Sequence, residues 1–267
     1  MSVLSYTVLD FADSSLNKTS VLVTGENDAI VVDAAFTRAD GHRIVAAVLD
    51  AGKTLRTVVV TGGDPDFYWG AEVIADAFPE AAFVAPADVI EHITAAYEGK
   101  LAAWAHLGAN LPTRLIELTA FTGGLELDGR TLELRHAGDS LGDRGWYLFE
   151  PQQRALLGGI LLFDGLHVWT ADSPTTADRA AWLTALDTLE ALQPTFVAAG
   201  HRTAGAPTDL SAIHHTRAYL TLFEETVAEA ADAAGAKEKL LAAYPDAGLV
   251  IAADLGTKVA KGELQWG

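Results

Sequence analysis

The sequence predicts an α/β fold in which two mixed β-sheets pack together with helices outside, an αββα sandwich. Short runs rich in β-branched residues alternate with helical patterns in both halves of the chain, as expected of two sheets covered by helices. The run at 55–61 (LRTVVVT) has an unbroken valine centre, which indicates a strand buried on both faces. The 267 residues contain no linker, low-complexity tract or close repeat, so we expect a single domain spanning residues 1–267.

In the first half, β-branched runs bounded by turn residues predict strands, and apolar residues at helical spacing predict helices. The turn signal GEND (25–28) separates the second and third strands, and a loop rich in glycine and aspartate (62–66) follows the valine-rich strand. The expected strands lie at 6–11, 20–24, 29–33, 55–61 and 81–86, and the expected helices lie at 39–49, 69–78 and 87–107.

The second half repeats this alternation of strand and helix signals. The expected strands lie at 114–118, 125–127, 131–136, 146–149, 155–162 and 195–199. A helix is expected at 176–192, and further helices continue to the C-terminus.

The composition excludes several classes of function. The chain has 36 acidic and 18 basic residues and a formal charge of −18, which repels phosphate backbones and anionic membranes. It has no cysteine, so disulfides, thiolate metal ligands and a cysteine nucleophile are excluded. With no signal-peptide pattern and no apolar run long enough to span a bilayer, we expect a cytoplasmic protein. The expected partner is a small-molecule substrate, with no nucleic acid and no membrane, and a homodimer is left open.

The loop at 61–70 (TGGDPDFYWG) resembles the signature T-H-x-H-x-D-H-x-x-G of the metallo-β-lactamase superfamily. As in that family, a V-V-D strand ending at Asp33 precedes the loop, and a lone histidine, His136, ends a later strand signal. A Gly-Gly pair (158–159) stands where the family has Gly-Asp, and a further strand leads into the Gly-His pair at 200–201. The resemblance spans nearly the whole chain. It implies the metallo-β-lactamase fold, whose active site lies at one end of the sandwich.

The resemblance also implies where two metal ions would bind, and most of their ligands are missing. The first metal corresponds to Gly62, Asp64 and His136, the second to Asp66, Phe67 and His201, and the bridging carboxylate to Gly159. A catalytic zinc takes about three protein donors and a water, whereas each position here keeps two donors. We therefore expect a degenerate metal site, no binuclear zinc hydrolase and no cofactor. The alternative is one zinc, iron or manganese ion held jointly by Asp64, Asp66, His136 and His201.

Without a metal, the surviving carboxylates and imidazoles are suited to proton transfer, because a carboxylate orients an imidazole and tunes it toward neutral pH. The expected catalytic residues are Asp66, His201, Asp64 and His136. The residues expected to bind substrate are Phe67, Tyr68, Trp69, His167, Trp169 and Trp146. The Tyr68 hydroxyl is also placed to donate a hydrogen bond to a developing oxyanion.

Structural roles compete with these interpretations. Asp64 precedes a helical pattern and is equally suited to capping it. The aromatic residues are as well suited to the core as to a ligand pocket. Asp33, at the end of its strand, is expected to accept hydrogen bonds that brace its loop.

The leading interpretation is a hydrolase-like enzyme, or a lyase or isomerase, that uses metal-independent acid–base chemistry. Hydrolysis, elimination, isomerisation and cyclisation of a small organic substrate, such as a biosynthetic intermediate, all suit these residues. One alternative is a mononuclear metallohydrolase that uses the four surviving ligands. The other is a non-catalytic, ligand-binding pseudoenzyme.

Overall fold

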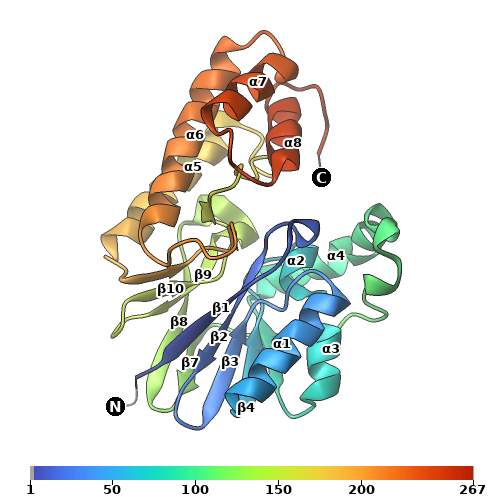
Figure 1. The fold of residues 1–267 in the computed structure, drawn as a ribbon, viewed down its shortest axis with the longest axis vertical. Coiled ribbons are helices and arrows are strands. Elements are labelled where there is room, and N and C mark those ends of the chain that lie inside the picture. The colour runs from blue at the N-terminus through green and yellow to red at the C-terminus, as the bar shows by residue number, and fades with distance from the viewer. Residues whose placement is uncertain (1–2, 267) are drawn as a thin grey trace.

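Two mixed β-sheets form the centre of the computed structural model, which describes residues 3–266 (Figure 1). In the first sheet, of order β1-β2-β3-β4-β5-β6, the strands β1 to β3 are antiparallel neighbours and the strands from β3 to β6 are parallel. These strands are β1 (Ser5–Asp10), β2 (Thr19–Thr24), β3 (Asp28–Val32), β4 (Thr54–Val59), β5 (Ala82–Ala85) and β6 (Thr119–Ala120). Helices connect the parallel strands, as crossovers between parallel strands require.

The second sheet has the order β12-β10-β9-β8-β7, in which only β10 and β12 are parallel neighbours. Its strands are β7 (Gly123–Leu127), β8 (Arg130–His136), β9 (Trp146–Glu150), β10 (Ala155–Leu157) and β12 (Phe196–Ala198). A separate parallel pair, β11 (Phe163–Asp164) and β13 (His201–Arg202), joins the segments that follow β10 and β12. The expected α/β fold of two mixed sheets is confirmed.

Alternating side chains pack the first sheet on both of its faces, as the period of a strand dictates. On β2, Val21 and Val23 pack against the second sheet, whereas Leu22 packs against the helices. On β4, Val59 faces the second sheet and Val58 faces the helices, and both are fully buried. The valine-rich run is therefore buried on both faces, as its sequence predicts.

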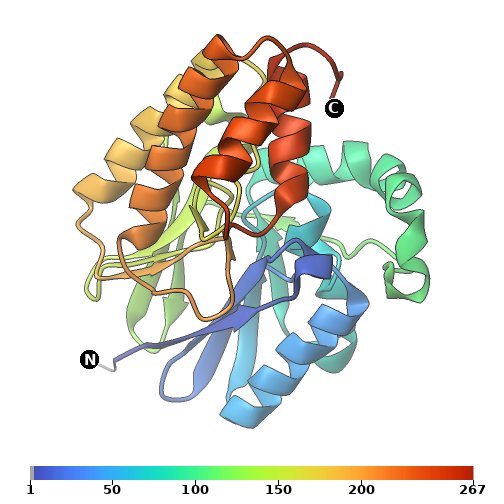
Figure 2. The same cartoon turned by 45° about the horizontal axis from the view of Figure 1, so that its top comes forward.

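Helices cover the outer faces of the two sheets (Figures 1 and 2). Helices α1 (Arg38–Ala51) and α3 (Ala71–Ala77) contact each other over the first sheet, and Ile44, Val48 and Ile74 pack there. On the other side, Trp182 and Phe223 from two long helices pack into the largest apolar cluster. The helices of the second half are α5 (Thr176–Ala191), α6 (Ser211–Glu229), α7 (Ala233–Ala243) and α8 (Val250–Ala260).

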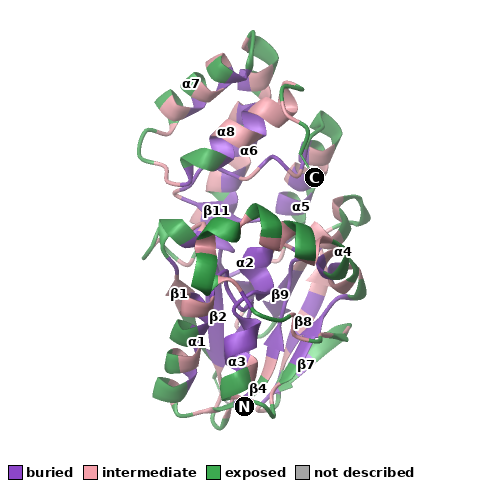
Figure 3. Ribbon diagram, turned by 90° about the vertical axis from the view of Figure 1, so that its right-hand side faces the viewer, coloured by how far each residue is buried: buried purple, intermediate pink, exposed green. Residues whose placement is uncertain are grey.

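The helix expected at 69–78 is α3, which begins after Gly70, and a separate short helix, α2 (Pro65–Tyr68), precedes it. Gly70 donates its amide to Ala35 O at 3.1 Å, and a Cβ at Gly70 would lie 2.1 Å from Ala34 O. The backbones therefore approach too closely for any other residue. All four residues of α2 are buried (Figure 3).

The helix expected at 87–107 is α4 (Ala87–Ala103), followed by the 3₁₀ segment η2 (Ala105–Asn110).

The strand expected at 114–118 is wrong, because pairing begins only at β6. The segment before β6 is held by side chains instead: Thr113 donates its amide to Glu72 at 2.7 Å. The strand expected at 155–162 ends at Leu157, because Gly158 and Gly159 have φ values of 71° and 75° and turn the chain away. No helix between residues 3 and 266 is long and apolar enough to cross a membrane.

A buried ion pair between Arg130 and Glu150 links β8 to the neighbouring end of β9. Glu150 is fully buried and accepts from the Arg130 Nη2 atom at 2.7 Å and from the Gln153 amide at 2.6 Å. Glu150→Ala removes the carboxylate that both donors face, so we expect the free energy of unfolding to fall by about 3 kcal/mol or more. Asp187→Ala is the control, because the Asp187 side chain is 70% exposed in its ion pair, and it should cost less than about 1 kcal/mol. Urea denaturation measures both, and equal losses would contradict the prediction.

Candidate active site

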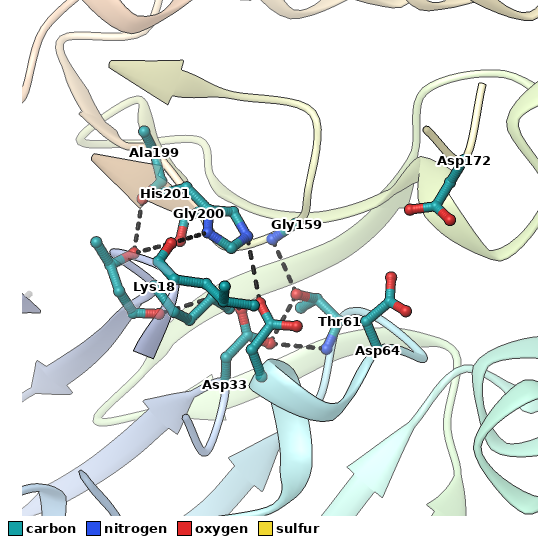
Figure 4. A network of polar contacts seen from close by, with 12 residues as sticks. Lys18, Asp33, Thr61, Asp64, Gly159, Asp172, Ala199, Gly200 and His201 are labelled. Atoms are coloured by element: carbon teal, nitrogen blue, oxygen red, sulfur yellow. Dashed lines mark hydrogen bonds and ion pairs between the residues drawn. The ribbon is translucent and has the colours of Figure 1, made fainter. Parts of the chain in front are cut away.

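Segments that are far apart in the sequence meet at the end of the first sheet where β2 begins and β3 and β4 end. Lys18 precedes β2, Asp33 follows β3, Thr61 lies just beyond β4, and His201 opens β13 (Figure 4). Lys18 and His201 form an antiparallel bridge, and the Thr19 amide donates to Gly200 O at 2.9 Å. This backbone pairing positions the side chains of the site.

The Lys18 side chain is completely buried, which is rare for a lysine and requires a partner. Its Nζ atom donates to Asp33 Oδ2 at 2.9 Å and to Thr19 O at 3.0 Å. Asp33 Oδ1 accepts from the amide and the hydroxyl of Thr61 at 2.9 and 2.7 Å. Asp33 thus braces the loop after β4, as expected, and it also balances the charge of Lys18.

Asp66 and His201 form a second pair in the site, which becomes an ion pair when the imidazole is protonated. Asp66 Oδ2 lies 3.3 Å from His201 Nε2, and each residue is 4% exposed. The contact is long and poorly directed for a hydrogen bond, and neither atom has another partner among residues 3–266. Burial disfavours the Asp66 carboxylate, but the attraction of His201 and the charge of Lys18 outweigh it and hold the pKa of Asp66 below its ordinary value.

The His201 imidazole is fixed by its other contacts. Its Nδ1 atom lies 3.0 Å from Leu16 O, and its ring stacks on Phe163 with centroids 4.9 Å apart. A carbonyl can only accept, so Nδ1 carries a proton and Nε2 is the atom that exchanges one.

Phe67 occupies the space in which side chains of a metal site would meet. Its ring lies edge-on to His201 at 6.3 Å, and the Lys18 ammonium lies 4.0 Å from its centroid. A Cβ at Gly62 would lie 2.9 Å from the Phe67 ring. Phe67 therefore fills the space that a larger side chain at Gly62 would need. With glycine at one position and phenylalanine at the other, neither of these two ligand positions supplies a donor to a metal.

Asp64 lies beside this cluster in a different environment. Its carboxylate accepts from Lys100 at 3.2 Å and is 19% exposed, and it makes no side-chain bond that would cap α2. Burial raises the pKa of Asp64, and repulsion from Asp172 and Asp66 raises it further. Figure 4 shows Asp64 and Asp172 on one side and His201 on the other.

His136 does not join the other surviving ligands. Its Nε2 lies 2.7 Å from Gly142 O, its Nδ1 accepts from the Gly138 amide at 3.2 Å, and its ring packs against Trp146 at 4.8 Å. Across the described residues, no group of three or more histidine, cysteine, aspartate or glutamate side chains could hold a metal ion. The four surviving ligand positions therefore do not converge on one point in this structure, and the residues present do not fit either family metal.

His167 is fully buried in a separate cluster. Its Nδ1 lies 3.1 Å from the Tyr219 hydroxyl, and its ring packs edge-on to Tyr244. Burial and repulsion from His215 lower the pKa of His167. Its contacts are with the helical layer and not with Asp66 or His201.

The aromatic residues expected to bind substrate lie in different parts of the structure. Trp69 stacks on Phe36 at 5.3 Å, which places it in the core. Trp146 donates its Nε1 to Asp88 at 3.0 Å, and Trp169 packs edge-on to Trp266 at 5.9 Å. Tyr68 is buried beside Asp66, and its hydroxyl has no partner within residues 3–266. The Tyr68 ring packs against Trp69 and Tyr97.

Sequence reasoning missed Lys18, Lys100, Asp172 and Arg144, of which Arg144 donates to Asp172 at 2.8 Å. Lys18 had one usable signal: it is a lone charge between Asn17 and the apolar run that forms β2. Two cavities, of about 360 and 270 Å³, lie elsewhere, between α7 and α8 and beside α4.

Comparison with known proteins agrees with this architecture. A metallo-beta-lactamase family protein from Thermus thermophilus is 17% identical with a TM-score of 0.64, and the match covers 97% of this chain and 93% of that one. A beta-lactamase domain protein from Burkholderia ambifaria is 16% identical with a TM-score of 0.65, covering 97% and 84%. A metallo beta lactamase from Erythrobacter litoralis is 21% identical with a TM-score of 0.51, covering 82% and 91%. No curated protein matches the chain.

At these identities, the solved structures show the fold alone. The sequence model of the metallo-beta-lactamase superfamily matches residues 16–201, which is more than half of the chain and includes every residue of the Lys18, Asp33, Asp66 and His201 cluster. The chain belongs to the metallo-beta-lactamase superfamily.

Proposed function

We propose that this protein is an enzyme that performs acid–base chemistry on a small organic substrate without a metal ion. The observation that carries the proposal is the buried Asp66–His201 pair, whose Oδ2 and Nε2 atoms are 3.3 Å apart and lack hydrogen-bond partners among the described residues. A fold satisfies most of its buried polar atoms, because each unsatisfied one costs about 1–3 kcal/mol. Free polar atoms on two adjacent ionisable residues are best explained by a ligand that completes their bonding.

The protonation states of His201, Asp66 and Tyr68 determine which proton transfers the site can perform. Leu16 O keeps the Nδ1 proton of His201 in place, so Nε2 takes a proton from the substrate or returns one to it. Asp66 stays ionised at neutral pH, because its pKa is held below the ordinary value, and it stabilises the imidazolium that forms. The Tyr68 hydroxyl stays protonated, because burial raises its pKa, and it can donate to an oxygen that gains charge.

Asp64 completes the set as a second acid. Its pKa is raised while that of Asp66 is lowered, so the two carboxylates hold different protonation states over an interval of pH. Pairs of titratable groups whose environments separate their pKa values are typical of acid–base active sites. This arrangement suits elimination, isomerisation, cyclisation or metal-free hydrolysis.

The activity test begins with protein that has been treated with chelator and dialysed. The panel contains one compound class for each reaction: β-hydroxy carbonyl compounds, enolisable ketones, linear precursors of cyclic products, and simple esters. We expect turnover of one class, unchanged by chelator, with products identified by mass spectrometry. Turnover that chelator abolishes would contradict the metal-free proposal. Binding without turnover across the panel would favour a ligand-binding pseudoenzyme instead.

With a substrate identified, His201→Gln and Asp66→Asn should each lower kcat by about 10²–10⁴, the usual contribution of a general acid or base. The matched control is His136→Gln, which also changes a family ligand position but lies outside the cluster, and it should keep kcat within about threefold. Steady-state kinetics measures all three variants. A loss for His136→Gln as large as that for His201→Gln would contradict the assignment.

The opposite pKa shifts of Asp66 and Asp64 predict opposite effects on stability. The folded pKa of Asp66 lies below the unfolded one of about 4, so its stabilisation is present above that value and is lost as pH falls through the folded pKa. Asp66→Asn should therefore lower Tm at pH 7, and the deficit should shrink below pH about 4.

For Asp64 the sign is reversed. Its folded pKa lies above the unfolded one, so ionisation costs stability as pH rises from about 4 through the folded value. Asp64→Asn should raise Tm at pH 7, and the gain should vanish near pH 4. In a chain of this size, 1 kcal/mol moves Tm by about 2–4 °C, which thermal scans at pH 4 and pH 7 resolve. Shifts of the same sign for both variants would contradict the assigned protonation states.

A further inference from the structure

The site contains more buried negative charge than the Asp66–His201 pair explains. Asp33 is fully buried and Asp66 is 4% exposed, and both belong to segments that surround Lys18. Buried carboxylates require a positive charge close by, supplied by a metal ion, a lysine, an arginine or a protonated histidine. Lys18 is the buried amine that supplies one here, through its contact with Asp33 at 2.9 Å.

Lys18 is held in contact with Asp33 and near the segment that carries Asp66. Its backbone bridges to His201, and its Nζ atom lies 4.0 Å from the centroid of Phe67, the residue that follows Asp66. Its charge is also one of the causes that lower the pKa of Asp66. The ammonium is thus in contact with one carboxylate and in electrostatic reach of the other.

We propose that the Lys18 ammonium is the resident cation of this site, where it supplies the positive charge that Asp33 and Asp66 require and keeps divalent metal ions out. The proposal is independent of the reaction that the protein catalyses. Two separate features then prevent metal binding. Phe67 has no donor atom where a ligand would stand, and the Lys18 ammonium places a positive charge that repels a metal cation. Restoring the ligand alone therefore does not restore the metal.

The experiment compares the zinc affinity of four forms of the protein. These are the wild type, Phe67→His, the double variant Lys18→Gln/Asp33→Asn, and the triple variant that combines all three changes. Phe67→His places a new histidine beside Asp66 and His201. These three side chains give one metal position three donors, the number that a catalytic zinc takes from protein. The paired change removes the ammonium together with the carboxylate that contacts it, and Asp66 keeps its contact with His201. Asparagine can still accept from Thr61 through its carbonyl oxygen.

The double variant is the matched control, because it lacks the resident cation but also lacks the third ligand. We expect the triple variant to bind one zinc per chain at least about tenfold more tightly than Phe67→His, as equilibrium dialysis or calorimetry measures. Cobalt substitution should give the visible absorption of a four- or five-coordinate ion in the triple variant only. Wild type, the double variant and Phe67→His should each stay below half an equivalent of tightly bound metal.

Two results would overturn the proposal. Zinc binding by Phe67→His as tight as by the triple variant would show that Lys18 does not exclude the metal. A triple variant that melts cooperatively but binds no zinc would show that the charge of Lys18 is not what keeps metal out. If the glutamine version does not fold, Lys18→Met with the same two partner changes replaces it. The Phe67→His result stands in either case, because that variant keeps the Lys18–Asp33 pair.

Discussion

Desolvating an ammonium and a carboxylate costs several kcal/mol per ion, and the buried pair of Lys18 and Asp33 must recover this from its contacts. Lys18 recovers it through the Asp33 carboxylate, the Thr19 carbonyl and the face of Phe67. Asp33 recovers it through Lys18 and the two donors of Thr61. The Thr61 hydroxyl in turn accepts from the Gly159 amide at 2.8 Å, so the pair holds the loop after β4 and the turn after β10 in one arrangement. His201 is bridged to Lys18, and Asp66 lies on the short helix that follows this loop.

The same arrangement bears on two positions where the resemblance places metal ligands. Gly62 and Phe67 stand where the resemblance places two histidines, and the Phe67 ring occupies the space beside Gly62. A histidine at either position alone would meet the ring or the lysine, because the two sites share one volume. The residues at these positions therefore form a packed arrangement with its own internal charge balance, and not simply a set of missing ligands. Gly159 fits the same account: a Cβ there would lie 2.5 Å from Trp146 O, so the bridging carboxylate has no space to return.

Sequence periodicity and turn signals predicted the two mixed sheets, the outer helices and most strand positions within a few residues, because hydrophobic alternation dominates those elements. They failed where tertiary contacts decide, as at 114–118, which Glu72 holds through Thr113. The resemblance placed Asp66 and His201 near each other, and the structure finds them 3.3 Å apart. It also suggested His136 and His167, which the structure engages elsewhere through local contacts that no motif records. Lys18 was missed because its role depends on being buried among Asp33, Phe67 and His201, and burial of a charged residue is invisible to periodicity.

The contact between Leu16 and His201 spans 185 residues of sequence, and the Thr19 hydroxyl donates to Ala199 O across 180. Contacts of such long sequence separation form late and slow folding, because the loop between them must close first. During synthesis, the first sheet can assemble while the segment that ends at His201 is still being made. In that interval Lys18 and Asp33 have each other but no covering strand, so water reaches a pair that the finished protein keeps dry. The buried pair is thus covered by β13, which comes late in the sequence, and a chain interrupted before residue 201 would expose charge that the folded chain buries.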